Sequence, residues 1–168
     1  MKKESSLFNF RLLLFFVLFG VIINSCQAPP DSRAGWHQLP AILNQIVAPE
    51  FPNQEFVISD FGAQGDGVTD CTEAFRKAIN ACHVAGGGRV RIPAGVFLTG
   101  AIHLKSNVNL HIEKGATVLF HQDINKYLPV VFTRFEGVEL MNFSPFIYAR
   151  NQENIAITGK GILDGNSD

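Results

Sequence analysis

The chain of 168 residues lacks the patterns that mark several common classes of protein. It has no run of basic residues, no alternation of aromatic and arginine residues, and no heptad repeat of apolar residues. Nucleic-acid-binding surfaces and coiled coils depend on such patterns. We therefore expect neither a nucleic-acid partner nor a coiled coil.

Cysteine is also scarce, with three residues in the whole chain. Cys71 and Cys82 are eleven positions apart in an expected helix, which separates them by about 16 Å along the axis. They cannot form a disulfide with each other at that separation. Cys82 continues an apolar stripe, and no base lies near Cys71 in the sequence, so we interpret both as structural residues rather than nucleophiles.

The longest apolar run, from Leu12 to Ile23, has twelve residues and is short for a membrane span, which needs roughly 20. Lysines and an arginine precede it, and Ser25 precedes Cys26. This pattern predicts a signal peptide over residues 1–25 and resembles the processing site of bacterial lipoproteins. We expect an exported lipoprotein, periplasmic or on the cell surface, anchored to the bacterial membrane through lipidated Cys26. The alternative is an ordinary cleaved signal and a secreted protein.

Residues 26–53 are rich in proline, which forbids a long helix or a central strand. We interpret this segment as a tether, with one short helix over residues 40–47 that packs on the following domain.

Residues 54–168 open with an apolar strand, a turn-rich block and an amphipathic helix. Asp70 can cap that helix, Glu73 stands where a capping box needs it, and an apolar stripe follows. Gly86-Gly87-Gly88 ends the helix and lacks the Lys-Ser/Thr ending of a phosphate loop. Such a helix can cover the open end of a solenoid of strands, so we predict an N-terminal cap.

From Arg89 onward, short apolar alternations predict strands of four or five residues. The stretch beginning Asn109-Leu110-His111-Ile112 has a counterpart at Asn154-Ile155-Ala156-Ile157, an offset of 45 residues. We interpret this offset as two coils of about 22 residues each in a parallel β-helix. Residues 121–145 interrupt the repeat and predict a surface excursion that borders a binding cleft. A layered α/β fold fits less well, because no helical pattern separates the later strands.

A series of ordered motifs carries a family resemblance. These are Ile92-Pro93-Ala94-Gly95, Leu98-Thr99-Gly100, Ile102-His103-Leu104-Lys105-Ser106-Asn107-Val108, Ile112-Glu113-Lys114-Gly115-Ala116, and the closing Asn154-Ile155-Ala156-Ile157-Thr158-Gly159-Lys160-Gly161-Ile162-Leu163-Asp164-Gly165. Together they resemble glycoside hydrolase family 28, the polygalacturonase-like pectin hydrolases. Residues 131–137 and 144–149 resemble its secreted bacterial branch.

The resemblance implies an all-β, right-handed parallel β-helix that hydrolyses α-linked galacturonan or related pectic chains with inversion. It implies no metal, no cofactor, and a monomer when complete. The family draws its catalysis from an Asn-x-Asp motif, an Asp-Asp pair, a Gly-His-Gly and an Arg-x-Lys on later coils. The last three are absent from this chain, and Asn166-Ser167-Asp168 lies too early to be the first. No catalytic residue can be assigned, so we expect an N-terminal, truncated part of the domain without glycosidase activity of its own.

Among the remaining polar residues, Arg134 is the candidate for substrate binding, because guanidinium groups bind uronate carboxylates in a bidentate manner. An ordinary salt bridge explains it equally well. Asp60, Asp66 and Asp70 fit turn chemistry better than a calcium loop, and Asp164 precedes a glycine as turn residues do. His103 and His111 alternate with apolar neighbours and should therefore point outward.

Two other functions stay open at this stage. One is a non-catalytic, lipid-anchored β-helix module that binds polysaccharide or serves adhesion. The other is a β-helix pectate lyase, which needs calcium carboxylates and a basic proton acceptor.

Overall fold

The computed structural model describes residues 35–167, so the predicted signal peptide, Cys26 and Asp168 lie outside the described residues. Two units are distinguished, one ending at Val47 and the other beginning at Ala48. The described part of the first unit contains the 3₁₀ helix η1 (Trp36–Gln38) and the helix α2 (Leu39–Leu43), in which Pro40 occupies the first turn. Proline suits that position because the first N–H groups of a helix have no intrahelical partner.

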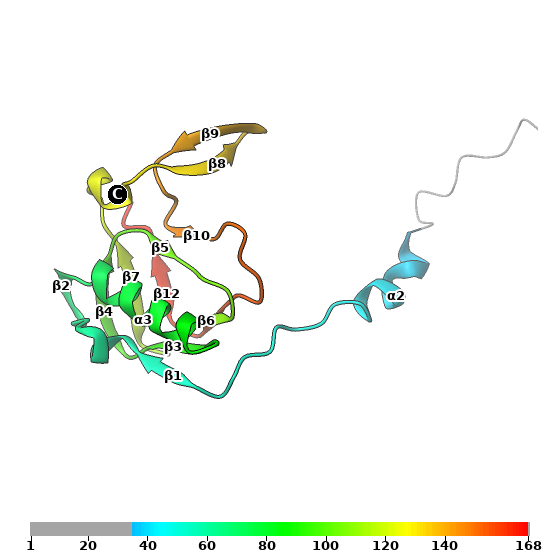
Figure 1. Ribbon diagram of the computed structural model, residues 1–168, viewed down its shortest axis with the longest axis horizontal. Helices are drawn as coiled ribbons and strands as arrows, with labels where there is room; N and C mark the ends of the chain where they lie inside the picture. The colour runs from blue at the N-terminus through cyan, green and yellow to red at the C-terminus, as the bar shows by residue number, and fades with distance from the viewer. Residues whose placement is uncertain (1–34, 168) are drawn as a thin grey trace, which may run out of the picture. The chain divides into compact units, whose positions relative to one another are not determined.

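The second unit is built from three parallel sheets that successive turns of the chain extend strand by strand (Figure 1). Sheet A contains β1 (Glu55–Val57), β3 (Gly88–Ile92), β6 (Val108–Ile112) and β11 (Ala156–Gly159). Sheet B contains β2 (Asp66–Asp70), β4 (Gly95–Thr99), β7 (Ala116–Phe120) and β12 (Ile162–Asp164). Sheet C pairs β5 (Ile102–His103) with β10 (Ile147–Tyr148). The chain passes from sheet to sheet in the order A, B, C, which makes a parallel β-helix as predicted.

The interior of this coil is filled by the alternate apolar residues of its strands. Strand side chains point alternately to the two faces of a sheet, so every second residue faces inward. The largest fully buried side chains of the strands are Ile92, Ile102, Leu110, Val90, Val108, Val118 and Phe120. Parallel stacking therefore places like residues above one another and buries them continuously.

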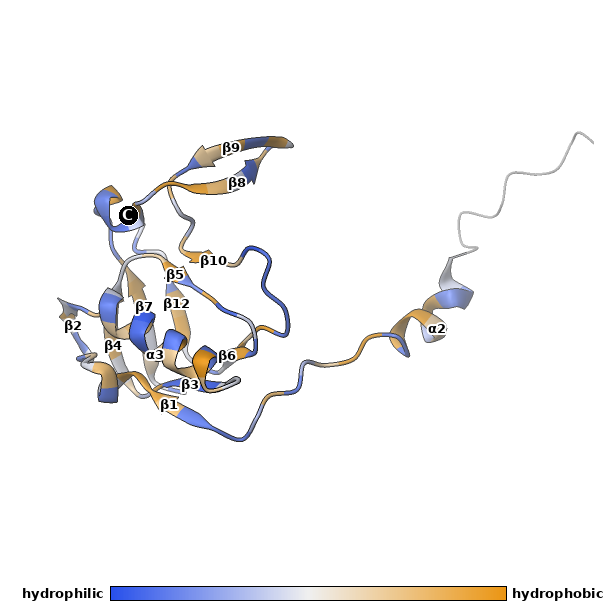
Figure 2. Ribbon diagram, viewed as in Figure 1, coloured by the Kyte–Doolittle hydropathy of each residue, from blue (hydrophilic) through white to orange (hydrophobic). Residues whose placement is uncertain are grey.

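Helix α3 (Thr72–Val84) closes one end of the coil, as predicted. It contacts β3, β4 and β5 and so touches all three sheets (Figure 1). Its buried stripe consists of Ala74, Phe75, Ala78, Ile79 and Cys82. Figure 2 shows hydrophilic residues on the other side of the same helix.

The predicted capping box does not form, because the N-cap of the helix is Cys71 rather than Asp70 and makes no side-chain capping hydrogen bond. The Oδ1 atom of Asp70 accepts a hydrogen bond from the Thr72 backbone N–H at 2.9 Å, but the Glu73 carboxylate accepts from the Arg76 guanidinium instead of reaching back. A charged donor one helical turn away forms the stronger hydrogen bond. The helix ends as expected, with Gly86 at φ +93° and Gly87 at φ +115°.

The interpretation of the 45-residue offset as two coils is wrong. Strands β6 and β11 are direct neighbours, with Leu110 opposite Ile157, so the offset spans a single coil. The coil before it has 20 residues, because Val90 of β3 pairs with Leu110 of β6. The register at this strand is also two residues longer than predicted, because His111 pairs with Thr158, an offset of 47.

Residues 121–145 supply the extra length of that coil and form the predicted excursion. They contain the 3₁₀ helix η3 (Ile124–Tyr127) and an antiparallel hairpin of β8 (Val131–Phe135) and β9 (Val138–Asn142). Figure 1 shows this hairpin projecting away from the three parallel sheets. Another 3₁₀ helix, η2 (Ile58–Phe61), lies between β1 and β2.

Both described cysteines are free and buried, as predicted for structural residues. Burial raises the pKa of the Cys82 thiol to about 11 and also raises that of Cys71. Neither thiol is therefore activated as a nucleophile. Among residues 35–167, no helix is long and apolar enough to cross a membrane.

Candidate functional site

The outer face of sheet A carries polar residues in rows that cross the strands. The register aligns Glu55, Arg89 and Asn109 in one row and places Arg91 beside His111 in the next. Their inward neighbours Val90 and Leu110 are fully buried, so period-2 alternation turns these polar side chains outward. The parallel register thus builds a continuous polar surface from residues far apart in sequence.

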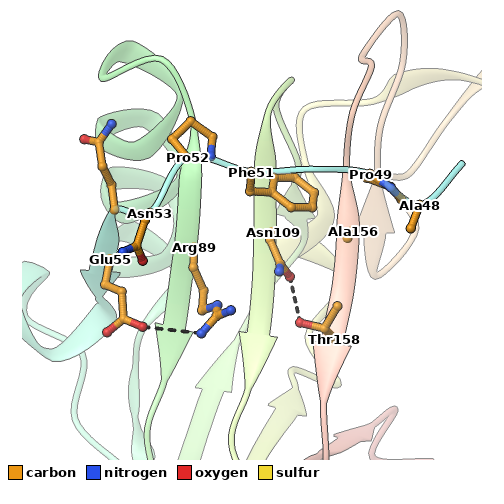
Figure 3. Close-up of a pocket in the computed structure, with 11 residues that line it drawn as sticks. Ala48, Pro49, Phe51, Pro52, Asn53, Glu55, Arg89, Asn109, Ala156 and Thr158 are labelled. Carbon is orange, nitrogen blue, oxygen red and sulfur yellow. Dashed lines mark hydrogen bonds and ion pairs between the residues drawn. The ribbon is translucent and has the colours of Figure 1, made fainter.

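A segment of the chain before β1 crosses this surface and encloses a hollow. Figure 3 shows residues 48–52 running across sheet A, with Phe51 close to Asn109. The backbone N–H of Arg89 donates to the Gln54 carbonyl at 2.8 Å, and Asn154 Nδ2 donates to the Glu50 carbonyl at 2.8 Å. These two hydrogen bonds fix the segment at both ends and leave a cavity of about 410 Å³ between it and the sheet.

The floor of this cavity is a chain of hydrogen bonds across two strands. Thr158 Oγ1 donates to Asn109 Oδ1 at 2.7 Å and lies 2.7 Å from His111 Nδ1. Because a hydroxyl has one proton to donate, His111 must carry its proton on Nδ1 and donate to Thr158. Asn109 is only 7% exposed as a residue, and its Nδ2 atom has no protein acceptor within residues 35–167 but still meets solvent, since it is not among the buried unpaired atoms.

Arg89 stands at the edge of the cavity with most of its donors free. Its Nη1 atom meets Glu55 Oε1 at 3.4 Å, a long contact between two half-exposed side chains. Glu55 also lies 3.5 Å from Arg91 Nε, while Arg91 Nη1 donates to Glu113 at 2.9 Å. The carboxylates therefore hold both arginines in place, and each guanidinium keeps N–H donors that no carboxylate of the described residues accepts.

A second, shallower hollow lies at the other end of strands β6 and β11. It is lined by His111, Glu113, Lys114, Gly159 and Lys160 and has a volume of about 550 Å³. His111 connects it to the first cavity through its hydrogen bond to Thr158. The two hollows thus belong to one polar face.

A further cavity of about 420 Å³ lies between α3, β5 and the start of the excursion. Arg76, Lys105 and Lys126 line it, together with the apolar Ile79 and Ile102. Lys126 Nζ donates to Asp70 at 2.7 Å, and Lys105 Nζ donates to Asn80 at 2.8 Å. The excursion therefore borders a cavity.

The predicted substrate residue Arg134 lies on hairpin strand β8, opposite Glu139. It is exposed, and its Nε atom donates a long hydrogen bond of 3.4 Å to the Gly137 carbonyl. It does not line the hollows of sheet A or the cavity beside α3. A role in substrate binding stays a prediction.

The two histidines point outward as predicted, but each bonds to the next coil. His103 Nε2 lies 2.9 Å from Ser144 Oγ, and burial lowers the pKa of this histidine. His111 belongs to the hydrogen-bond chain of sheet A. They are bridging residues between coils rather than simple solvated positions.

The aspartates of the opening block make turns. Asp66 accepts hydrogen bonds from the backbone N–H groups of Val68 and Thr69, which together with the Thr69 hydroxyl lower its pKa to about 2. Asp164 accepts from the Asn166 N–H at 2.8 Å, again closing a turn. Asp60 lies in η2.

The sequence analysis missed Arg89, Asn109 and Phe51. The alternation around Val90 was enough to place Arg89 and Arg91 on an outer face, and the same holds for Asn109 beside Leu110. Phe51 lies in the proline-rich segment, which has no periodic pattern that could locate it.

Comparison with known proteins agrees with this architecture. Residues 56–115 match the family model described as rhamnogalacturonase A/epimerase, pectate lyase-like. The exo-poly-alpha-D-galacturonosidase of Dickeya chrysanthemi is 39% identical over 117 residues, which cover 65% of this chain and 19% of that protein. The matched segment spans about a fifth of the length of the Dickeya protein and of a probable polygalacturonase from Vitis vinifera.

Solved structures show the same similarity. A hyperthermoactive exopolygalacturonase from Thermotoga maritima is 54% identical with a TM-score of 0.74, covering 77% of this chain and 29% of that one. The family 28 exopolygalacturonase of Yersinia enterocolitica is 34% identical with a TM-score of 0.61, covering 68% and 21%. The described coils therefore form a right-handed parallel β-helix that is similar, in sequence and in structure, to the polygalacturonases of glycoside hydrolase family 28.

Proposed function

We propose that this chain supplies the N-terminal coils of an exported pectin hydrolase of polygalacturonase type. The observation that carries the proposal is the 54% identity to the Thermotoga maritima exopolygalacturonase over 77% of the chain. The reaction would be inverting hydrolysis of α-galacturonosyl or related bonds. The same relatives favour exo-action, because the Dickeya and Yersinia proteins also carry exo-acting names.

Inverting hydrolysis requires two carboxyl groups, one protonating the leaving oxygen and one activating water, about 6.5–9.5 Å apart. The sequence contains no Asp-Asp pair, and Asp66, Asp70 and Asp164 are engaged in turns. We therefore propose that the catalytic carboxylates belong to coils beyond those described here.

The last described coil supports this proposal. Ile162 and Leu163 are each more than two-fifths exposed, although their partners on the preceding coil, Thr117 and Val118, are half-buried and buried. Strands β11 and β12 also have one edge without a partner among the described residues. Further coils would cover both features.

Hydrolysis of polygalacturonate tests the function directly. We expect the 168-residue chain to release no reducing ends, and a product of the same gene extended by further coils to release them with inverted anomeric configuration. Exo-action predicts that mono- or digalacturonate appears from the first time point. Activity of the pure 168-residue chain, or inactivity of the extended product, would contradict the proposal.

We also propose that the mature protein is a membrane-anchored lipoprotein, modified at Cys26, and a monomer when all coils are present. The support is the signal-like sequence before Cys26. Incorporation of labelled fatty acid into the expressed protein, and its loss in Cys26→Ser, is the expected result. Labelling that persists in Cys26→Ser would contradict it.

A further inference from the structure

The outer face of sheet A holds a polar group that the fold itself leaves unused. Asn109 lies almost completely buried beneath the crossing segment, where its Oδ1 atom is matched and its Nδ2 donor is not. The Nδ2 atom itself still meets solvent in the cavity, because it is not one of the fully buried unpaired atoms of the described residues. An amide donor directed into a cavity of about 410 Å³ is therefore suited to a ligand hydroxyl or carboxylate.

The cavity combines this donor with an aromatic wall and a guanidinium group. Phe51 comes from the crossing segment, and Arg89 comes from the next strand of the sheet (Figure 3). An aromatic side chain offers an apolar contact for the flat side of a sugar ring, while a guanidinium binds a carboxylate in a bidentate manner. These are the groups that a uronate presents: a ring, several hydroxyls and one carboxylate.

Charge along the face favours an anionic ligand. The charged side chains that line the two hollows, lie between them or face Arg91 are the cations Arg89, Arg91, Lys114 and Lys160 and the carboxylates Glu55, Glu113 and Asp60. The cations exceed the carboxylates by one, whereas the whole chain has a formal net charge of −1. Lys114 follows the end of β6, five residues after Asn109, and Lys160 follows the end of β11, two residues after Thr158, so the positive charge extends from one hollow to the other.

We propose that the outer face of sheet A binds an acidic oligosaccharide. One uronate unit lies beneath residues 48–53, with its carboxylate on Arg89, a hydroxyl on Asn109 Nδ2 and its ring against Phe51. The following units cross Thr158 and His111 toward Lys114 and Lys160. The choice of galacturonan as the preferred ligand rests on the proposed function, but the site itself does not.

The test is calorimetric titration of the full chain with hexagalacturonate and with its fully methyl-esterified form. We expect binding of the acid that weakens as ionic strength increases, because exposed charges are screened. Arg89→Gln should weaken binding of the acid about tenfold, the usual effect of losing one charge-assisted hydrogen bond. The same variant should bind the ester as the parent chain does.

Glu55→Gln should have the opposite effect on the affinity for the acid. The Glu55 carboxylate faces both Arg89 and Arg91 and would repel a bound uronate, so its removal should tighten binding of the acid about threefold. A purely structural role for the Arg89–Glu55 pair would not predict a gain. Arg76→Gln and Glu73→Gln are controls of the same chemistry, since they break an Arg–Glu pair on α3, away from sheet A, that is 65% exposed against 47–48% for Arg89–Glu55; they should leave binding unchanged.

The outcomes separate this site from the proposed function. Failure of the acid to bind, or an affinity that Arg89→Gln does not change, overturns the inference even if an extended gene product hydrolyses polygalacturonate. Arg89-dependent binding of oligomannuronate in preference to hexagalacturonate supports the site and contradicts the pectic function. Equal binding of a single-stranded oligonucleotide overturns the inference, because it would mean that the face only attracts polyanions.

Discussion

The inner coils and the last coil carry the same kind of side chain at matching positions but differ in what covers it. Val90, Leu110 and Ile157 occupy one register position in β3, β6 and β11. The first two are 0% exposed, whereas Ile157 is 44% exposed. Burial in a parallel β-helix therefore depends on the neighbouring coil as much as on the residue, because each coil contributes only one layer of the interior.

The strongest test of this comparison is removal of the same apolar bulk in both regions. Leu110→Ala should lower the free energy of unfolding by about 3 kcal/mol, because it leaves a cavity between two layers of the interior. Ile157→Ala should lower it by about 1 kcal/mol, because much of that side chain already meets solvent. Denaturant unfolding of the full chain measures both. Equal losses would show that the last coil is covered in solution.

The last coil is also tied to the one before it by close backbone contact, and Gly159 is where this occurs. It has φ +110°, and a Cβ atom there would collide with the Ile112 backbone. Gly159→Ala should destabilise the protein by about 2 kcal/mol from strain and displacement of β11. Gly86→Ala is the control, with φ +93° but open space, and should cost about 1 kcal/mol. A thermal melt in which the two variants coincide would contradict the close contact.

Asp70 links the capped end of the coil to the excursion through its hydrogen bond with Lys126. The charge of Asp70 makes the stability of this junction depend on pH. Burial by itself would raise the pKa of this carboxyl, but hydrogen bonds from Lys126 and Thr72 outweigh it and lower the pKa to about 2 from 3.8. The folded state therefore binds the proton less tightly than the unfolded state. Its contribution to stability is complete above the unfolded value of 3.8 and is lost as the pH falls toward 2.

We expect that contribution to be about 1 kcal/mol, since the side chain is one-third exposed and solvent screens the pair. Asp70→Asn should lower stability by that amount at neutral pH and by almost nothing at about pH 2. Urea unfolding at the two pH values measures the difference. A loss that is independent of pH would show that packing, rather than the charge, stabilises this junction.

The smallest effects are expected in the projecting hairpin. Arg134→Gln should change the free energy of unfolding by less than about 0.5 kcal/mol, because the one side-chain hydrogen bond that it makes within residues 35–167 is long and exposed. Arg150→Gln should cost slightly more, about 0.5–1 kcal/mol, because its guanidinium lies 4.2 Å from the ring centre of Phe132. A larger loss in Arg134→Gln would indicate a structural salt bridge. Weaker hydrolysis by an extended product carrying this variant would support substrate binding.

Local pattern was sufficient for most of the fold. Alternation predicted β3 and β6, the apolar stripe predicted α3, and aspartate next to glycine predicted the turn at Asp164. These features depend on residues close together in sequence, whose geometry follows from backbone periodicity. The capping box failed because Cys71 is the N-cap of the helix and Glu73 has a competing charged partner, Arg76, within reach.

The site on sheet A could be predicted only in part. The outward direction of Arg89 and Asn109 follows from alternation, but their position side by side follows from the register between coils. Segment 48–53 contains no period that places Phe51 over Asn109. The cavity therefore depends on contacts between parts of the chain that the sequence does not connect.

The sequence by itself determined the strands, their inward residues, the capping helix and the resemblance to polygalacturonases, because each of these is encoded in short motifs. Only the tertiary structure decided that β6 and β11 are adjacent and that the excursion belongs to a single coil. Hydrogen bonding between parallel strands sets that register, and a long insertion can leave it intact while it lengthens the repeat in the sequence. The same stacking decides which apolar residues are buried and which polar residues meet on the outer face of sheet A.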